Sequence, residues 1–196
     1  MGLANALNMK IVVGVSCGEL FKVDTVRSIL GVIKHTSHEV DTVIQQGCWL
    51  HENRNLLSRY AVEKEASHIL FVDSDMCFPD DTLDRLLEHD KEIVGANYFL
   101  RRSPKFSVVK FGNENNIMPA STTPQSLFEC FSVGGGLVLV KTWVFAKLTK
   151  PLWYHDQYKG ELMGEDVYFC RNAHRSGFRV WCDGTLKILH IGDYAY

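Results

Sequence analysis

The sequence lacks any long hydrophobic segment and any basic tract. No stretch of its 196 residues approaches the roughly 20 consecutive apolar residues that a membrane-spanning helix requires. Lys and Arg never occur more than two in a row, and the formal net charge is -2. These absences argue against a membrane-spanning protein and against a protein whose main task is to coat nucleic acid.

Paired cysteine motifs are also missing. The six cysteines include no CxxC pair and no zinc-finger spacing. Several lie within apolar segments, which favours small buried side chains in a reducing compartment. Residues 1–9 contain neither the basic region nor the long apolar region of a secretion signal. We therefore expect a soluble, cytoplasmic protein.

The composition that remains is that of an ordinary globular protein. Hydrophobic residues make up 46% of the chain, charged residues 22% and aromatic residues 11%, which allows a sizeable core. No internal repeat or low-complexity segment is visible. A chain of this length predicts one domain over residues 1–196.

The first half of the chain alternates between strand and helix patterns. Apolar or alternating segments predict strands, and apolar residues at helical spacing predict helices. The expected strands cover 10–15, 40–46, 69–72 and 92–96, and the expected helices cover 21–34, 53–66 and 81–89. This strand–helix order predicts an α/β fold with a parallel, doubly wound sheet.

The pattern changes after Tyr98 and becomes mixed and partly antiparallel. The expected strands cover 105–111, 127–133, 137–140, 179–182 and 186–189, and the expected helices cover 142–148 and 165–176. A polar loop with Pro119 and Pro124 separates the first two of these strands. It is long enough to predict a functional or mobile segment.

The motif Asp73-Ser74-Asp75 follows the apolar segment 69–72 directly. Open α/β sheets bind ligands at the carboxyl ends of their strands, which is where this acidic pair is expected. Two carboxylates so close together favour a divalent cation between them. The alternative is an acidic turn that caps the next helix, but Asp80 and Asp81 already serve that purpose.

A second acidic motif, Gly164-Glu165-Asp166, opens an expected helix. Acids in a first helical turn stabilise the helix dipole, which needs no functional explanation. One of them could instead act as a general base toward an acceptor hydroxyl. The Asp73-Ser74-Asp75 motif far upstream favours the catalytic interpretation.

His190 lies at the end of the last expected strand. A lone histidine after an apolar segment is more often structural than a ligand. Its position nevertheless makes it the candidate imidazole for a metal otherwise bound by oxygen. We expect the other histidines to lie on the surface: His35, His38, His51, His68, His89, His155 and His174.

Arg54 and Asn55 lie near the start of the second expected helix, where Asn53 would be the cap. They predict either a solvated helix face or a contact to a donor phosphate or base. Arg101 and Arg102 predict either a surface pair or a contact to a phosphate or to the acceptor. The glycines 134–136 predict either a tight bend or a close approach of a ligand to the backbone.

Trp153 and Tyr154 lie in a segment rich in aromatic residues. They predict either core packing or a platform on which a sugar ring stacks.

The arrangement of these motifs resembles that of a GT-A glycosyltransferase of the broad family-2-like group, in the short form found in phages and bacteria. The resemblance runs in order over most of residues 10–192. Its segments are KIVVGVS, the helix with Arg54 and Asn55, ILFVDSDMCFPDDTLDRLL, SVGGGLVLVKTWVF, GEDVYFCRNAHRSGFRVW and LKILHIG. It implies a GT-A fold in one catalytic domain, with a nucleotide-sugar half at about 10–98 and an acceptor half at about 99–192.

The resemblance also implies roles for individual residues. Asp75 and His190 would be ligands of Mn2+ or Mg2+, and Asp73 would contact the metal or the nucleotide ribose. Asp166 would be the base of an inverting reaction, with Glu165 as its neighbour contacting acceptor or donor. The implied donor is a UDP- or GDP-sugar, and the acceptor is an unidentified glycan, lipid, protein or nucleic-acid base. The remaining donor contacts would be Ser16, Arg54, Asn55, Ser74 and Gly135.

The sequence leaves two other classes of protein open. A binding module for nucleotide-sugars or carbohydrates could keep the fold without turnover. A phosphatase of the haloacid-dehalogenase type also has two aspartates after an apolar strand, with the first as nucleophile. Such an enzyme usually has Thr or Val after the second aspartate, where this chain has Met76.

Overall fold

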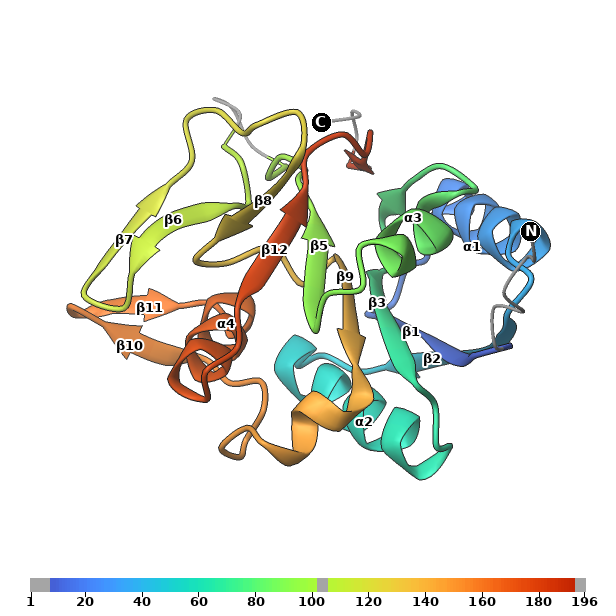
Figure 1. Ribbon diagram of the computed structural model, residues 1–196, viewed down its shortest axis with the longest axis horizontal. Coiled ribbons are helices and arrows are strands. Elements are labelled where there is room, and N and C mark those ends of the chain that lie inside the picture. Colours follow the sequence, from blue (N-terminus) through green and yellow to red (C-terminus); the bar gives the residue numbers. More distant parts are fainter. Residues whose placement is uncertain (1–7, 102–105, 193–196) are drawn as a thin grey trace, which may run out of the picture.

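A computed structural model describes residues 8–101 and 106–192. Its centre is a seven-stranded sheet with the order β2-β1-β3-β9-β5-β12-β8 (Figure 1). The strands are β1 (Lys10–Cys17), β2 (Glu39–Gln46), β3 (His68–Asp73), β5 (Ile93–Ala96), β8 (Leu127–Cys130), β9 (Leu137–Lys141) and β12 (Val180–Asp183).

The direction of the strands follows the order of the elements. Each of the pairs β1–β2, β1–β3 and β5–β12 is parallel, whereas β9 is antiparallel to both β3 and β5. β8 is antiparallel to β12 at one edge of the sheet. The sheet is therefore mostly parallel with an antiparallel part from the second half of the chain, which confirms the expected α/β class.

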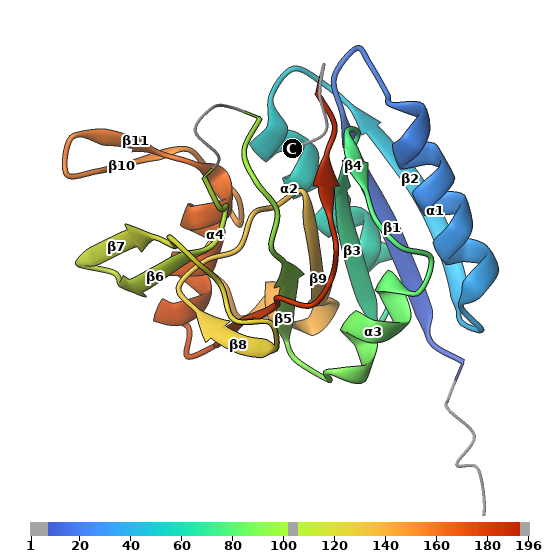
Figure 2. The same cartoon turned by 90° about the horizontal axis from the view of Figure 1, so that it is seen from above.

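Helices cover both faces of the sheet (Figure 2). On one face, α1 (Val23–His35) and α3 (Thr82–Glu88) pack on side chains such as Val13 and Leu70. On the other, α2 (Leu50–Glu63) and α4 (Glu165–Arg175) pack on alternating neighbours such as Val12 and Ile69. Successive strand residues point to opposite faces, so one apolar strand supplies both cores.

The edge strand β2 shows why the central strands are more apolar. Its side chains alternate between exposed and half-buried, whereas seven of the eight residues of β1 are buried. A central strand has a helical layer on each side, and an edge strand does not.

Several short elements differ from the sequence prediction. β6 (Lys110–Asn113) forms a hairpin with β7 (Asn116–Pro119), which lies in the segment expected to be a loop. β10 (Asp156–Tyr158) and β11 (Glu161–Met163) form a second, unexpected hairpin. The predicted helix 142–148 is the 3-10 helix η1 (Thr142–Ala146).

β13 (Leu189–His190) is much shorter than the expected strand, and it pairs with β4 (Met76–Cys77) outside the central sheet. α2 begins at Leu50 rather than at 53, so Asn53 lies in its first turn and is not its cap. Its amide instead approaches the carbonyl oxygens of Gly47 and Cys17 at 3.4 and 3.5 Å. This contact ties the start of α2 to the ends of β1 and β2.

All six cysteines are free, and four of them are buried. Cys48 is exposed and Cys77 is half-buried, so the expectation of buried side chains holds only for the others. Within 8–101 and 106–192, no helix combines the length and the apolar character of a membrane span. The prediction that His68 lies on the surface is wrong, because the residue is 9% exposed beside Ser67.

Candidate functional site

The candidate site lies where β1, β3 and β5 end and β9 begins. Asp73 is the last residue of β3, and its backbone nitrogen donates to the carbonyl oxygen of Gly136 at 3.0 Å. The strand order β2-β1-β3 places β1 between β2 and β3, so the connections from β1 and β3 diverge at this edge. Ligands of open α/β sheets bind at such a switch point.

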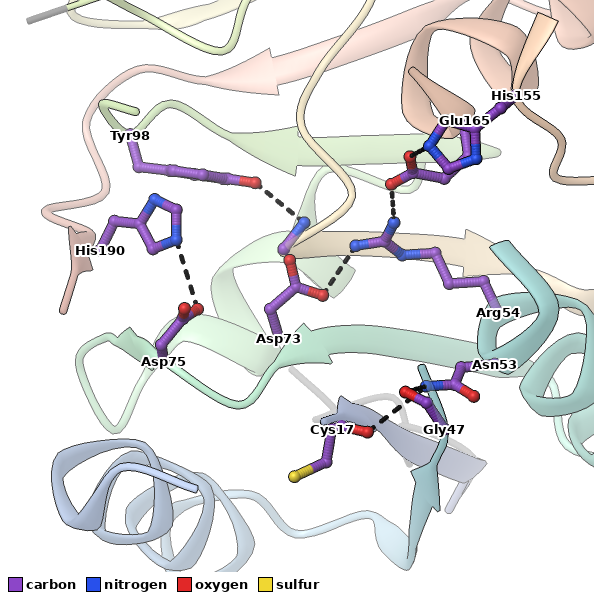
Figure 3. A network of polar contacts seen from close by, with 11 residues as sticks. Cys17, Gly47, Asn53, Arg54, Asp73, Asp75, Tyr98, His155, Glu165 and His190 are labelled. Atoms are coloured by element: carbon purple, nitrogen blue, oxygen red, sulfur yellow. Dashed lines mark hydrogen bonds and ion pairs between the residues drawn. The ribbon is translucent and has the colours of Figure 1, made fainter. Parts of the chain in front are cut away.

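Arg54 forms the buried centre of this region (Figure 3). Its side chain is 1% exposed, its Nη2 donates to Asp73 Oδ1 at 2.7 Å, and its Nη1 pairs with Glu165 Oε1. The guanidinium also lies 5.5 Å from the ring centroid of Trp153. A Cβ at Gly135 would lie 2.7 Å from Arg54 Cζ, so the absence of a side chain there makes room for the guanidinium.

The charges of this group influence one another. Burial alone would lower the pKa of Arg54, but Asp73, Glu165 and Asp166 raise it above its ordinary value. Burial raises the pKa of Asp73 despite the opposing charge of Arg54. Arg54 is therefore charged, and a buried ion pair connects the end of β3 with the start of α4.

Asp75 lies two residues beyond β3, and its carboxylate faces Arg101 and His190. Its Oδ2 is 3.0 Å from Arg101 Nη1, and its Oδ1 is 3.3 Å from His190 Nε2. Burial opposes ionisation of Asp75, but His190 and Arg101 outweigh it and lower the pKa of the carboxyl. Arg102, predicted together with Arg101, lies outside the described residues.

His190 is held in place from three sides. Its Nδ1 lies 3.2 Å from the carbonyl oxygen of Phe99, and the Tyr98 ring packs edge-on at a centroid distance of 5.5 Å. The pairing of β13 with β4 sets His190 opposite Met76, and Ile191 N donates to Asp75 O at 2.7 Å. The carbonyl oxygen of Phe99 accepts the proton of Nδ1, which leaves Nε2 as the ring nitrogen that faces Asp75.

Asp166 lies in the first turn of α4, where its Oδ1 accepts a hydrogen bond from Val167 N at 2.7 Å. Burial, followed by the charge of Glu165, raises the pKa of Asp166. The same carboxylate contributes to the raised pKa of both Arg54 and Tyr98. Asp166 is therefore electrostatically part of the group around Arg54.

Tyr98 lies in the candidate site and is not among the residues that the sequence predicted. It is buried, and its hydroxyl oxygen accepts a hydrogen bond from Gly136 N at 2.9 Å. A Cβ at Gly134 would lie 2.3 Å from that oxygen. The sequence feature that indicates this role is its position two residues beyond β5, at the same edge of the sheet as Asp73.

The remaining predicted donor contacts take different positions. Asn55 pairs with the backbone of Trp153, donating at 2.8 Å and accepting at 3.2 Å. Ser74 N donates to Ser16 O at 3.1 Å, and Thr25 Oγ1 donates to Ser74 O at 3.1 Å. Ser16 is buried, and among the described residues its Oγ has no hydrogen-bond partner.

The donor set around Asp75 fits a divalent cation. Within 8–101 and 106–192, no group of three or more His, Cys, Asp or Glu side chains could hold a metal, so the protein offers a pair. Asp75 Oδ1 is buried and accepts no hydrogen bond from the described part of the chain, while His190 Nε2 faces it. A carboxylate oxygen is a ligand that Mn2+ and Mg2+ both prefer, with a diphosphate and water supplying further oxygens, and the imidazole nitrogen of His190 favours Mn2+ over the harder Mg2+.

Comparisons with known proteins identify the fold. No protein-family model and no curated protein matches the chain. The chain is similar to A197 from STIV, whose crystal structure superposes with a TM-score of 0.66 at 15% identity, over 94% of this chain and 86% of that one. This chain therefore has a GT-A fold.

A second similar structure is S. aureus TarS 1–349 in complex with UDP-GlcNAc. The TM-score is 0.48 at 16% identity, and the match covers 89% of this chain and 56% of TarS 1–349. At 15% identity the likeness to A197 shows the fold and not the activity.

Proposed function

We propose that this protein is a metal-dependent, inverting glycosyltransferase of the family-2-like group, which moves a sugar from a UDP- or GDP-sugar to an acceptor hydroxyl. The observation that carries the proposal is the approach of His190 Nε2 to Asp75 Oδ1 at 3.3 Å, at the switch point of the sheet. The two residues lie 115 positions apart in the sequence and present a paired oxygen and nitrogen donor. Asp73 is placed beside them by Arg54.

Asp75 and His190 would hold Mn2+ or Mg2+, with Asp73 as an outer contact. When bound, the cation neutralises charge on the diphosphate leaving group. The chain's own contribution is to orient these ligands. Phe99 O fixes the His190 ring through Nδ1, and Arg54 fixes the Asp73 carboxylate.

Asp166 is the proposed general base. It would accept the proton of the acceptor hydroxyl while that oxygen forms its bond to the anomeric carbon and the nucleoside diphosphate leaves. Its pKa is raised by burial and by Glu165, which makes a carboxylate a better proton acceptor near neutral pH. Glu165 is held by Arg54 and supports the site rather than accepting the proton.

The free state of all six cysteines supports a reducing location, and we propose the cytoplasm as the place of the reaction.

A binding module without turnover is the second candidate, and one contact favours it. Arg101 lies 3.0 Å from Asp75 Oδ2 and supplies positive charge there without a metal. The site disfavours a phosphatase, because the nucleophile would be Asp73, whose Oδ1 is already engaged by Arg54 at 2.7 Å.

A donor-hydrolysis assay tests the proposal. A panel of UDP- and GDP-sugars with Mn2+ should yield free nucleoside diphosphate with the wild type and none with Asp75→Asn or Asp166→Asn. Asp24→Asn is the matched control, because Asp24 is half-exposed on α1 and pairs only with Arg27 among the described residues. Metal-independent donor binding without product in every condition would favour the binding module.

The stereochemistry needs a second measurement. Proton NMR of the transferred sugar should show an anomeric configuration opposite to that of the donor. Retention would contradict Asp166 as base, because only the inverting reaction uses a base on the far side of the anomeric carbon.

A further inference from the structure

Two imidazoles outside the Asp75 region form a contact that restricts their protons. His51 lies in the first turn of α2, and His155 directly precedes β10. Their Nδ1 atoms are 3.1 Å apart, and the ring planes are nearly perpendicular at 85°. One proton between the two nitrogens makes this a hydrogen bond, whereas a proton on each would make them repel.

The far nitrogen of each ring faces a carboxylate. His155 Nε2 lies 3.0 Å from Glu165 Oε2, and His51 Nε2 lies 3.5 Å from Glu52 Oε1. The other oxygen of Glu165 pairs with the buried Arg54, as Figure 3 shows. A continuous series of polar contacts therefore leads from the partly exposed imidazoles into the candidate site.

The contacts allow few proton arrangements. A carboxylate oxygen 3.0 Å from His155 Nε2 places a proton on that nitrogen, so a neutral His155 has a bare Nδ1. His51 then donates from its own Nδ1. One additional proton, on the His51 nitrogen that faces Glu52, gives the pair a single positive charge. A second additional proton would separate the rings.

We propose that His155, oriented by His51, is a positioning residue that holds Glu165 against Arg54 and makes this arrangement sensitive to pH. The consequence for turnover rests on the proposed glycosyl transfer, but the coupling of the two rings does not. The titratable and charged groups around the pair are Glu52, Glu165, Tyr154, whose ring lies edge-on to His51, and Arg54 beyond Glu165.

Ring-nitrogen NMR tests the coupling without any substrate. Protein labelled with 15N-histidine is titrated across about pH 5 to 8, the range in which histidine changes charge. The wild type should show His155 with its proton on Nε2 near neutral pH, and the pair should take up its protons in two separate steps. In the His51→Asn variant, His155 should take up its proton in a single step. His35→Gln, which replaces a half-exposed histidine of α1, should leave the titration of both rings unchanged.

Turnover supplies the second readout. His155→Ala should lower kcat about tenfold, the lower end of the loss seen when a group that orients a metal ligand is removed, with the donor KM unchanged. His155→Gln places an amide nitrogen near the position of Nε2 and should restore most of kcat. It should also remove the part of the acid-side decline that comes from the imidazole pair, because Gln does not titrate, and leave the part that comes from protonation of Asp166.

Independent titration of the two rings, unchanged in each other's variants, would overturn the proposal. So would a His155→Gln enzyme with the wild-type acid limb. Co2+ absorption bands lost in His51→Asn but kept in His190→Ala would show a metal ion between the rings and contradict the shared proton. If the rings are coupled but the wild type turns over no donor, the proposed function fails and the coupling stands.

Discussion

Arg54 Nη2 lies 2.7 Å from Asp73 Oδ1, with the guanidinium 1% exposed. The same guanidinium pairs with Glu165, so one buried cation serves two carboxylates that lie far apart in the sequence. Because Asp73 ends β3 and Glu165 begins α4, this group fixes the position of one half of the chain against the other.

Replacing Arg54 with Met should destabilise the protein by about 3–5 kcal/mol, because two buried carboxylates lose their counter-charge. Urea unfolding measures the change in the free energy of unfolding. Arg27→Met is the control, because Arg27 is exposed and pairs only with the half-exposed Asp24 among the described residues. This variant should have nearly the same free energy of unfolding as the wild type. Equal effects in the two variants would show that the buried ion pair adds nothing.

Gly135→Ala should destabilise the protein by about 1–3 kcal/mol, because a new Cβ would meet the guanidinium carbon of Arg54 at 2.7 Å. Gly18→Ala is the matched control, since a Cβ there would meet nothing within 4 Å. Thermal unfolding of the two variants checks the difference. A Gly135→Ala protein as stable as Gly18→Ala would contradict the close packing of glycine and arginine.

The protein should lose stability as the pH falls from 6.5 toward 4. Burial, with the charge of Lys141, lowers the pKa of His68 from 6.5 to about 4. The unfolded chain therefore takes up a proton before the folded one does, and the free energy of unfolding falls by at most about 3 kcal/mol over this window.

Denaturant titrations at neutral and acid pH measure this loss for the wild type and for His68→Gln. The variant should lose less stability than the wild type over the same window. A control variant at the half-exposed His35 should keep the full wild-type dependence. The same dependence in His68→Gln would place the proton uptake elsewhere.

Removing either proposed metal ligand should weaken Mn2+ binding by more than about tenfold. Loss of a residue that merely orients a ligand already costs about 10–100-fold, so loss of the ligand costs at least as much. Electron paramagnetic resonance of free Mn2+ compares the wild type with Asp75→Asn, His190→Ala and the control Asp24→Asn. Unchanged affinity in both ligand variants would move the metal site away from Asp75.

Arg101→Ala should change Mn2+ affinity in the opposite direction. Arg101 lies 3.0 Å from Asp75 Oδ2 and competes with a cation for the carboxylate. Its removal should tighten Mn2+ binding several-fold in the same resonance titration, since one local positive charge is lost. Weaker binding in this variant would assign Arg101 a supporting role toward the diphosphate instead.

The sequence predicted most of the framework because its signals are local. The apolar segment of β3, its acidic end and the amphipathic pattern of α4 each lie within a few residues of one another, and the structure has these elements at nearly the expected bounds. The hairpins β6–β7 and β10–β11 escaped prediction. Their strands are short, mostly exposed and without a clear alternating pattern.

In the candidate site, too, the residues with a local sequence signal were predicted and the others were not. Asp73, Asp75, Glu165 and Asp166 were recognisable from their positions at the end of a strand and the start of a helix. The structure adds Tyr98 and His155, which carry no local signal comparable to an acidic motif. His155 in particular lies in an aromatic segment, and only its contacts with His51 and Glu165 indicate a role for it.

By itself, the sequence determined the kinds of element and the acidic motifs at their ends, because periodicity and strand-end chemistry are properties of neighbouring residues. Only the tertiary structure decided which charges meet. Strand order sets β9 beside β3 and brings Gly135 against Arg54, and the β13–β4 pairing brings His190 to Asp75. Such contacts depend on packing between distant segments, for which a local pattern carries no information.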